Sequence, residues 1–321
     1  MCSELAKDVP TNMSIKMPSL TPSSLSSLIP SSVPSEVQNV QGKDCMKEAI
    51  GADKIARQFS QAAKHYQEHD KVQRLSAQRL RTKMTPIGRL LDIGCGPGTD
   101  FSAAPGLNEV LGLDIAPGML SQMLESFPSY KALCGDAQAL PLSDASIDTL
   151  YSNLALQWCS DIKTAIGELA RVLKPGSQCH LAIVVDGSLS ELDALGLRVN
   201  AFEQAQTLLD GFSDSHWQIE HHSVEPLRVH FDDLKTLLYS IKGVGASAAM
   251  GSDVSQGSDV TQDSDASHGP DDTQGSVSKP PPRLRGRQDW LALCERAEKM
   301  RQPEGLPLTY QILFIHASRR G

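Results

Sequence analysis

The feature that most constrains the fold is an apolar run that leads directly into a glycine-rich turn, LLDIGCGPG at residues 90–98. Glycine at positions 94 and 96 lets the backbone come close to a ligand, where a Cβ would collide. The pattern predicts a strand, then a turn that binds a ligand, then a helix that opens after the turn. A turn with a purely structural role is the alternative interpretation.

Short apolar runs and helical patterns alternate on both sides of this turn. Strands are predicted at 89–93, 110–114, 130–134, 147–153, 178–185 and 306–315, and helices at 117–126, at 162–173 and around Trp290. Two further helices are expected before the first strand, one through Ile55 and Phe59 and one through Val72 and Leu80. Strands that alternate with helices are typical of right-handed crossovers and of a parallel sheet. The predicted fold class is therefore α/β.

Two segments of low complexity bound this domain. Residues 1–44 are rich in Ser and Pro and have little apolar periodicity, which predicts a disordered tail. Residues 251–282 contain a decaying hexad that begins GSDVSQ and GSDVTQ. One Val in each hexad is too little to fill the core of a solenoid, so a disordered insert is expected. The domain then consists of residues 45–250 together with a helix and a last strand in 283–321.

Charge and cysteine content narrow the function classes for this chain of 321 residues. A net charge of −8 disfavours broad binding to nucleic acid or to anionic membranes. No apolar run reaches the length of a membrane helix, and the N-terminus resembles neither a signal peptide nor an Arg-rich transit peptide. Seven cysteines without a C-x-x-C pair predict neither a disulfide framework nor a zinc site. A cytoplasmic location is expected.

An acidic residue precedes the glycine turn and indicates the charge of its ligand. The spacing is G-x-G-x-G, and Thr99 stands where the nicotinamide-dinucleotide pattern requires its third glycine. Asp92 lies two positions before the first glycine, where its carboxylate would repel the phosphates of a dinucleotide. A carboxylate there suits a cationic ligand, such as the ammonium of the methionine moiety of S-adenosylmethionine.

Polar residues also end the strands after this turn. Asp114 ends the second predicted strand, Asp136 follows the third and Asn153 ends the fourth. The carboxyl ends of parallel strands meet at one edge of the sheet, where α/β proteins bind ligands. Asp114 can accept hydrogen bonds from both ribose hydroxyls, and Asp136 is placed for the adenine amine. Each acid alone could be a helix cap, but together these residues predict a nucleoside site.

Several stretches resemble a known group of enzymes. Residues 92–98 (DIGCGPG), 113–120 (LDIAPGML), 135–141 (GDAQALP) and 173–176 (LKPG) resemble class I S-adenosylmethionine-dependent methyltransferases. Three more selective stretches are similar to the malonyl-[acyl-carrier protein] O-methyltransferases of biotin synthesis: FSQAAKHY at 59–66, SNLALQWC at 152–159, and FDD at 231–233 with KGVGA at 242–246 and LTY at 308–310. The resemblance covers residues 47–248 and 284–318. The 251–282 insert and the Pro105-Gly106 break after the turn depart from the family pattern.

The resemblance implies a Rossmann-like, mostly parallel seven-stranded sheet with helices on both faces and N-terminal lid helices. It implies S-adenosylmethionine as methyl donor, no metal, and a cofactor site that comprises Tyr66, Asp92, Gly94, Gly96, Asp114, Ile115, Met119, Asp136, Ala137 and Asn153. The substrate would be the free carboxylate of a malonyl thioester on acyl carrier protein or on coenzyme A, and the product a methyl ester that primes pimeloyl synthesis.

A malonyl carboxylate is ionised at neutral pH, so the reaction needs no general base. Alignment and exclusion of water should provide the catalysis. Tyr66, Gln157 and Trp158 are the predicted substrate-positioning residues, although Tyr66 and Trp158 could instead be packing residues. An acidic carrier protein would need local cations, and the candidates are Arg228, Lys235, Lys242, Arg283, Arg285 and Arg287.

Two alternatives stay open at this point. The chain could methylate another small acid or a quinone, although no histidine on the loop after the fourth strand offers the base that a phenol ring would need. It could instead be a non-catalytic assembly factor of a respiratory complex, a group that PLTYQI at 307–312 also resembles. Such a scaffold would tolerate loss of Asp92, Asp114 and Asp136, which are all present. The pair His221-His222 does not predict a metal site, because neighbours on a strand point to opposite faces.

Overall fold

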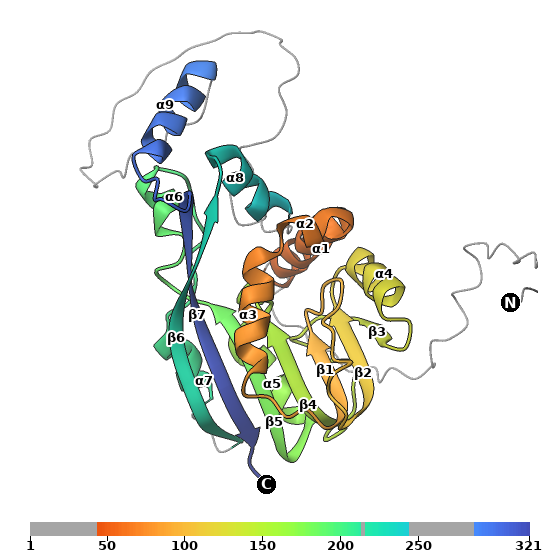
Figure 1. Cartoon of the computed structure of the whole chain (residues 1–321). Coiled ribbons are helices and arrows are strands. Elements are labelled where there is room, and N and C mark those ends of the chain that lie inside the picture. Colours follow the sequence, from red (N-terminus) through yellow and green to blue (C-terminus); the bar gives the residue numbers. More distant parts are fainter. Residues whose placement is uncertain (1–43, 213–215, 244–285) are drawn as a thin grey trace, which may run out of the picture. The chain divides into compact units, whose positions relative to one another are not determined.

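The computed structural model describes residues 44–212, 216–243 and 286–321. A seven-stranded sheet runs through these residues in the order β3-β2-β1-β4-β5-β7-β6 (Figure 1). Its strands are β1 (Gly88–Ile93), β2 (Leu107–Asp114), β3 (Lys131–Cys134), β4 (Ile147–Asn153), β5 (Leu173–Val184), β6 (Trp217–Phe231) and β7 (Leu306–Arg319). The predicted insert, 251–282, and all of the predicted tail except Asp44 lie outside the described residues.

The strand directions follow from the connections. β1 to β5 pair in parallel, and β7 lies antiparallel between β5 and β6. The helices are α1 (Asp44–Ala62), η2 (Ala63–His65), α2 (Tyr66–His69), α3 (Lys71–Arg81), α4 (Pro117–Ser126), η3 (Leu156–Trp158), α5 (Ile162–Val172), α6 (Ser190–Ala194), α7 (Ala205–Gly211), α8 (Leu234–Gly243) and α9 (Arg287–Glu298). This arrangement confirms the predicted Rossmann-like α/β class.

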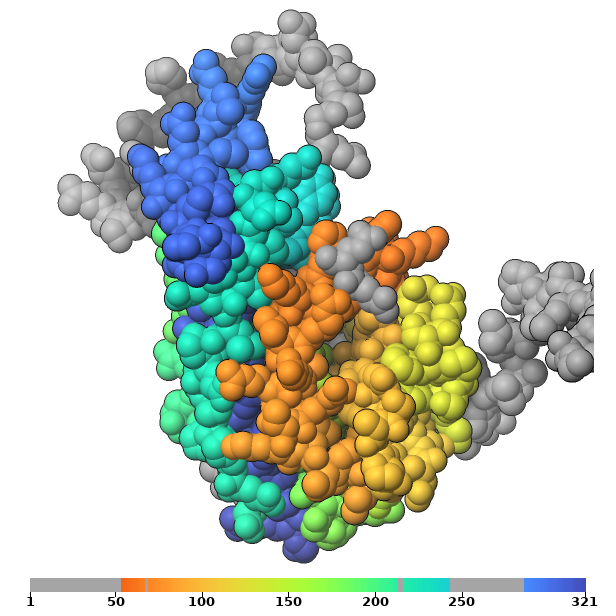
Figure 2. Space-filling model, in the orientation of Figure 1, coloured from red at the N-terminus to blue at the C-terminus, as the bar shows by residue number. Residues whose placement is uncertain are grey.

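Helices cover both faces of the sheet because neighbouring residues of a strand point to opposite sides. Leu91 and Ile93 of β1 pack in one apolar cluster with residues of α5 and α7. Leu90, beside Leu91 on the same strand, packs in the other cluster with Val72 and Leu80 of α3. In the space-filling view α3 lies across the middle of this second face, between β6 and the β1–α4 region (Figure 2). Two cores therefore hold the strands in a fixed register.

The N-terminal helices lie at the carboxyl edge of the parallel strands (Figure 1). The amide of Gly118, in the first turn of α4, donates a hydrogen bond of 3.3 Å to the hydroxyl of Ser60 in α1. The side-chain amide of Asn153, at the end of β4, donates one of 3.1 Å to the carbonyl of Gln73 in α3. Helices α1 and α3 are thus fastened to the edge where the glycine turn lies.

The prediction of a helix directly after the glycine turn is wrong. Residues 94–106, all of which are described, form turns and contain no helix. Gly98 has φ +98°, and Pro105-Gly106 interrupts the chain before it enters β2. Phe101 is buried in the α3 cluster and its amide donates to the hydroxyl of Tyr130, which holds the segment in its non-helical path.

Two further differences concern the second half of the sheet. β5 begins at Leu173 instead of Gln178, because Lys174-Pro175-Gly176 belongs to the strand and does not precede it. The long strand β6 and helices α6 to α8 were not predicted as elements. None of the helices in the described residues is long and apolar enough to cross a membrane.

Candidate active site

A cavity of about 700 Å³ lies at the carboxyl edge of β1 to β4, beneath the N-terminal helices. Its volume is within the range of small-molecule sites, about 300–1,000 Å³. Every predicted cofactor residue except Asp92 lines it: Tyr66, Gly94, Gly96, Asp114, Ile115, Met119, Asp136, Ala137 and Asn153. The residues that the sequence singled out at separate strand ends therefore meet in one place.

The glycine turn directly follows β1 and lines the cavity. Gly94 has φ +64°, and a Cβ there would lie 2.1 Å from the Cβ of Ala155 in the loop after β4. Gly96 has φ +53°, and a Cβ there would lie 3.9 Å from the Cζ of Tyr66. Position 94 thus requires glycine both for its backbone conformation and for the close approach of the next loop.

Asp114 joins the glycine turn to the start of α4. Its carboxylate accepts hydrogen bonds from the amide of Gly96 at 2.9 Å and from the amide of Ala116 at 2.8 Å. The residue is 8% exposed, and burial raises the pKa of its carboxyl group above the usual value. Two carboxylate oxygens offer about four lone-pair positions, so acceptor capacity is left for a ligand.

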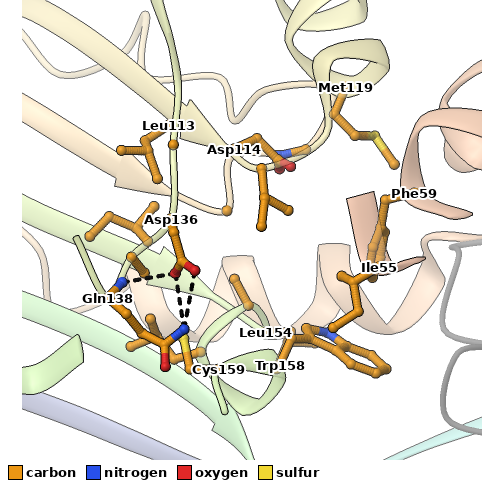
Figure 3. Close-up of a pocket in the computed structure, with 18 of the residues that line it drawn as sticks. Ile55, Phe59, Leu113, Asp114, Met119, Asp136, Gln138, Leu154, Trp158 and Cys159 are labelled. Atoms are coloured by element: carbon orange, nitrogen blue, oxygen red, sulfur yellow. Dashed lines mark hydrogen bonds between the residues drawn. The ribbon is translucent and has the colours of Figure 1, made fainter. Parts of the chain in front are cut away.

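Asp136 faces the cavity from the loop after β3. Its carboxylate accepts from the backbone amide of Gln138 at 2.9 Å and from that residue's side-chain amide at 3.1 and 3.2 Å. The side-chain carbonyl of Gln138 in turn accepts from the amide of Asp161 at 2.7 Å, and Asp161 caps the N-terminus of α5. Figure 3 shows Asp114 and Asp136 on the sheet side of the cavity, opposite Phe59 and Trp158.

Asp92 is buried at the end of β1, 3% exposed, and does not line the cavity. Burial raises the pKa of its carboxyl group to about 7; a hydrogen bond from Thr99 opposes this shift, and the charge of Asp114 adds to it. A buried carboxyl group with a raised pKa beside a cleft is typical of functional sites. Contact of Asp92 with a ligand stays a prediction.

Aromatic residues close the side that faces the N-terminal helices. The rings of Phe59 in α1 and Trp158 in η3 meet edge to face, with centroids 5.6 Å apart at 76°. The Tyr66 ring lies close to Gly96 of the glycine turn, and burial raises the pKa of its phenol. Three rings from α1, α2 and η3 thus line this side of the cavity.

A second, smaller cavity of about 60 Å³ adjoins the first one. Phe59, Tyr66, Leu154 and Trp158 line both cavities, whereas Gln157 lines only the smaller. The three predicted substrate-positioning residues therefore all line the smaller cavity.

The large cavity has an acidic lining. Of the described residues that line the large one, the charged members are Asp114, Asp136 and Asp161, all acidic, which suits a cationic ligand.

The candidate carrier-docking cations lie elsewhere. Arg228 is on β6, Lys235 and Lys242 are on α8, and Arg287 begins α9; Arg283 and Arg285 lie outside the described residues. Within residues 44–212, 216–243 and 286–321, no group of three or more His, Cys, Asp or Glu side chains could hold a metal ion.

Sequence reasoning missed several residues that line the cavity. Gln138, Leu154 and Cys159 line it without having been singled out, although the quoted stretches 135–141 and 152–159 contain them. Leu154 has φ +54°, an unusual value for leucine. Its amide donates to Ala182 of β5. Such backbone strain is typical of ligand sites, but the sequence alone carries no signal of it.

The chain is similar to known proteins in sequence and in fold. Residues 91–181, from β1 into β5, match the methyltransferase domain family. A chain of the complex between the Haloferax volcanii Trm112 methyltransferase activator and a methyltransferase has the same fold, with a TM-score of 0.50 at 16% identity, over 83% of this chain and 98% of that one. The fold and the site define a class I S-adenosylmethionine-dependent methyltransferase.

Two relatives show to which family of methyltransferases the chain belongs. The chain is 34% identical to the malonyl-[acyl-carrier protein] O-methyltransferase of Erwinia pyrifoliae over 64% of this chain and 80% of the relative. It is 31% identical to that of Herminiimonas arsenicoxydans over 84% of this chain and 97% of the relative. The chain belongs to the malonyl-[acyl-carrier protein] O-methyltransferase family. It is an S-adenosylmethionine-dependent O-methyltransferase, which removes the scaffold alternative.

Proposed function

We propose that this enzyme methylates the free carboxylate of a malonyl group carried as a thioester on acyl carrier protein. The product is the methyl ester that primes pimeloyl synthesis in the biotin pathway. The observation that carries the proposal is the similarity to the Herminiimonas arsenicoxydans enzyme, which extends over 97% of that relative. The cytoplasmic location expected from the cysteines stays a prediction.

The large cavity is proposed to hold S-adenosylmethionine. Asp114 accepts hydrogen bonds from the ribose hydroxyls at the lone-pair positions that the amides of Gly96 and Ala116 leave open. The side-chain amide of Gln138 holds the carboxylate of Asp136 in place, and this carboxylate accepts a hydrogen bond from the adenine amine. Asp92 and the turn at Gly94 and Gly96 hold the methionine end. The acidic lining supports this assignment, because it favours a ligand with positive charge.

When bound, S-adenosylmethionine supplies an electrophilic sulfonium methyl group. The protein residues have to position a carboxylate that is already ionised and to remove its water. Tyr66, Gln157 and Trp158 line the cavity beside the cofactor site and are proposed to position the malonyl group there. The aromatic contact between Phe59 and Trp158 excludes water from the same place.

Carrier docking is proposed to use the exposed cations of β6, α8 and α9. Acyl carrier proteins present an acidic helix, and charge complementarity across an interface raises the association rate. Arg228, Lys235, Lys242 and Arg287 are the described residues that could supply this charge. Preference for the carrier over coenzyme A would depend on them.

A methyl-transfer assay with labelled donor tests the proposal. Malonyl-carrier, malonyl-coenzyme A and acetyl-carrier are compared under one set of conditions. We expect labelling of the malonyl thioesters and none of acetyl-carrier, because acetyl has no free carboxylate. Equal labelling of acetyl-carrier would exclude the carboxylate as the acceptor. Labelling of a quinone or of another small acid in place of malonyl would favour a different acceptor.

A further inference from the structure

The smaller cavity has the size and the position of a site for one substrate group. About 10–15 Å³ of such volume holds one water, so its volume of about 60 Å³ has room for four to six small atoms. A carboxymethyl group has four non-hydrogen atoms. Tyr66 and Leu154 belong to both cavities, so a group in the smaller cavity lies next to whatever occupies the larger.

The charge of the smaller cavity is opposite to that of the cofactor cavity. Among the described residues that line it, Arg198 alone is charged. It lies between α6 and α7, on an exposed segment, and no hydrogen bond or ion pair joins its side chain to another residue in the described part of the chain. Arginine side chains pair readily with carboxylates. The two neighbouring cavities therefore present acids to one ligand and a cation to the other.

Neutral donors complete the lining. Tyr66 and Tyr310 both line the smaller cavity. Burial raises the pKa of each phenol, with Asp70 adding to the shift at Tyr66 and Glu191 at Tyr310. Both phenols consequently stay protonated and can donate a hydrogen bond to an anion without bringing a second charge.

One buried acceptor in this cavity also has no donor. The side-chain amide of Gln157 donates to the carbonyl of Leu154 at 2.6 Å. Its carbonyl oxygen is buried and has no hydrogen-bond partner among the described residues. Buried polar atoms are nearly always paired, so this oxygen is open to a hydrogen-bond donor of a ligand or of a water.

We propose that the smaller cavity is the carboxylate site of the enzyme, in which Arg198 pairs with the malonyl carboxylate and the Tyr66 and Tyr310 phenols donate hydrogen bonds to it. The inference rests on the proposed function and names the residues that recognise its substrate. Arg198 selects malonyl over acetyl, because only the malonyl group has a carboxylate that can pair with the guanidinium.

Binding measurements on three variants test this assignment. Affinities for malonyl-carrier and acetyl-carrier are measured by calorimetry with S-adenosylhomocysteine present, so that no transfer occurs. We expect the wild type to prefer malonyl-carrier by roughly 10- to 100-fold, the effect of charge-assisted hydrogen bonds. Arg198→Gln should lose this preference and keep its affinity for S-adenosylhomocysteine. Arg198→Lys, which keeps the charge but not the planar fork, should fall between them.

The matched control is Arg320→Gln, an exposed arginine just beyond β7 at the opposite edge of the sheet. It should behave as the wild type. An unchanged malonyl preference in both Arg198 variants would overturn the assignment. If the glutamine variant does not fold, the lysine variant alone provides the test. A wild type that neither prefers nor methylates malonyl-carrier would instead contradict the proposed function, whatever the Arg198 variants do.

Discussion

Replacement of Asp114 by alanine is expected to lower the affinity for S-adenosylmethionine between about a hundredfold and ten-thousandfold. Two charge-assisted hydrogen bonds to the ribose are worth roughly 1.5–3 kcal/mol each, or about 3–6 kcal/mol together. The variant also loses the contacts that hold the glycine turn, since Gly96 and Ala116 both donate to this carboxylate. Titration calorimetry with S-adenosylhomocysteine measures the loss directly.

The fold should survive this change. Loss of two backbone contacts costs about 1–3 kcal/mol, and the variant no longer has to bury a carboxylate whose pKa burial raises. We therefore expect the melting temperature to fall by only several degrees. Asp144→Ala is the matched control, because it removes an exposed carboxylate that pairs with Arg171. An Asp114→Ala variant that bound the cofactor as tightly as this control would refute the assigned role.

Acidification from pH 7 to pH 5 is expected to destabilise the protein through a buried histidine pair. The Nδ1 atoms of His180 on β5 and His316 on β7 lie 2.7 Å apart, and the residues are 2% and 6% exposed. One ring donates and the other accepts, an arrangement that two neutral rings can make. Burial lowers the pKa of both; His316 adds to the shift at His180, and Lys83 and His221 add to it at His316.

The lowered pKa values set the direction of this pH dependence. A histidine whose pKa is lowered in the folded state stabilises the protein above its unfolded pKa, about 6.5. This stability is lost as the pH falls below 6.5 toward the folded pKa. At pH 5 the loss is about 2 kcal/mol for each histidine, at about 1.36 kcal/mol per pH unit. Asp92, whose pKa is raised to about 7, titrates in the opposite sense, so the comparison has to be made between variants.

Urea unfolding at pH 5, 6 and 7 measures this effect. His316→Asn removes one member of the pair and should flatten the pH dependence relative to the wild type. His222→Asn, at an exposed position of β6, should leave it unchanged. Stability curves of wild type and His316→Asn that run parallel from pH 7 to 5 would show that the pair does not titrate as described.

The parts of the fold that could be predicted carry their signals locally. β4 and α4 have the predicted bounds, Ile147–Asn153 and Pro117–Ser126, because apolar alternation marks the strand and Pro117 begins the helix. The glycine turn and the acids at the ends of β1, β2 and β3 could be placed at one edge because the carboxyl ends of parallel strands lie at the same edge.

The rest depends on contacts that no short pattern records. The strand and glycine turn at 90–98 predict a helix next. The burial of Phe101 and its hydrogen bond to the hydroxyl of Tyr130 instead hold the segment after Gly98 in turns. Arg198 and Tyr310 line one cavity although more than a hundred residues separate them, and neither lies in a motif of the cofactor site. His180 and His316 become neighbours only through the antiparallel pairing of β5 and β7.

Identification of the atom that receives the methyl group tests the central claim most directly. Malonyl-carrier is incubated with the enzyme and methyl-labelled S-adenosylmethionine, and the product is hydrolysed in alkali. An ester on the carboxylate releases the label as volatile methanol, whereas methylation of the malonyl carbon leaves it in a non-volatile acid. We predict that the label is recovered as methanol; label retained in the acid, or absent from the carrier altogether, would contradict the account.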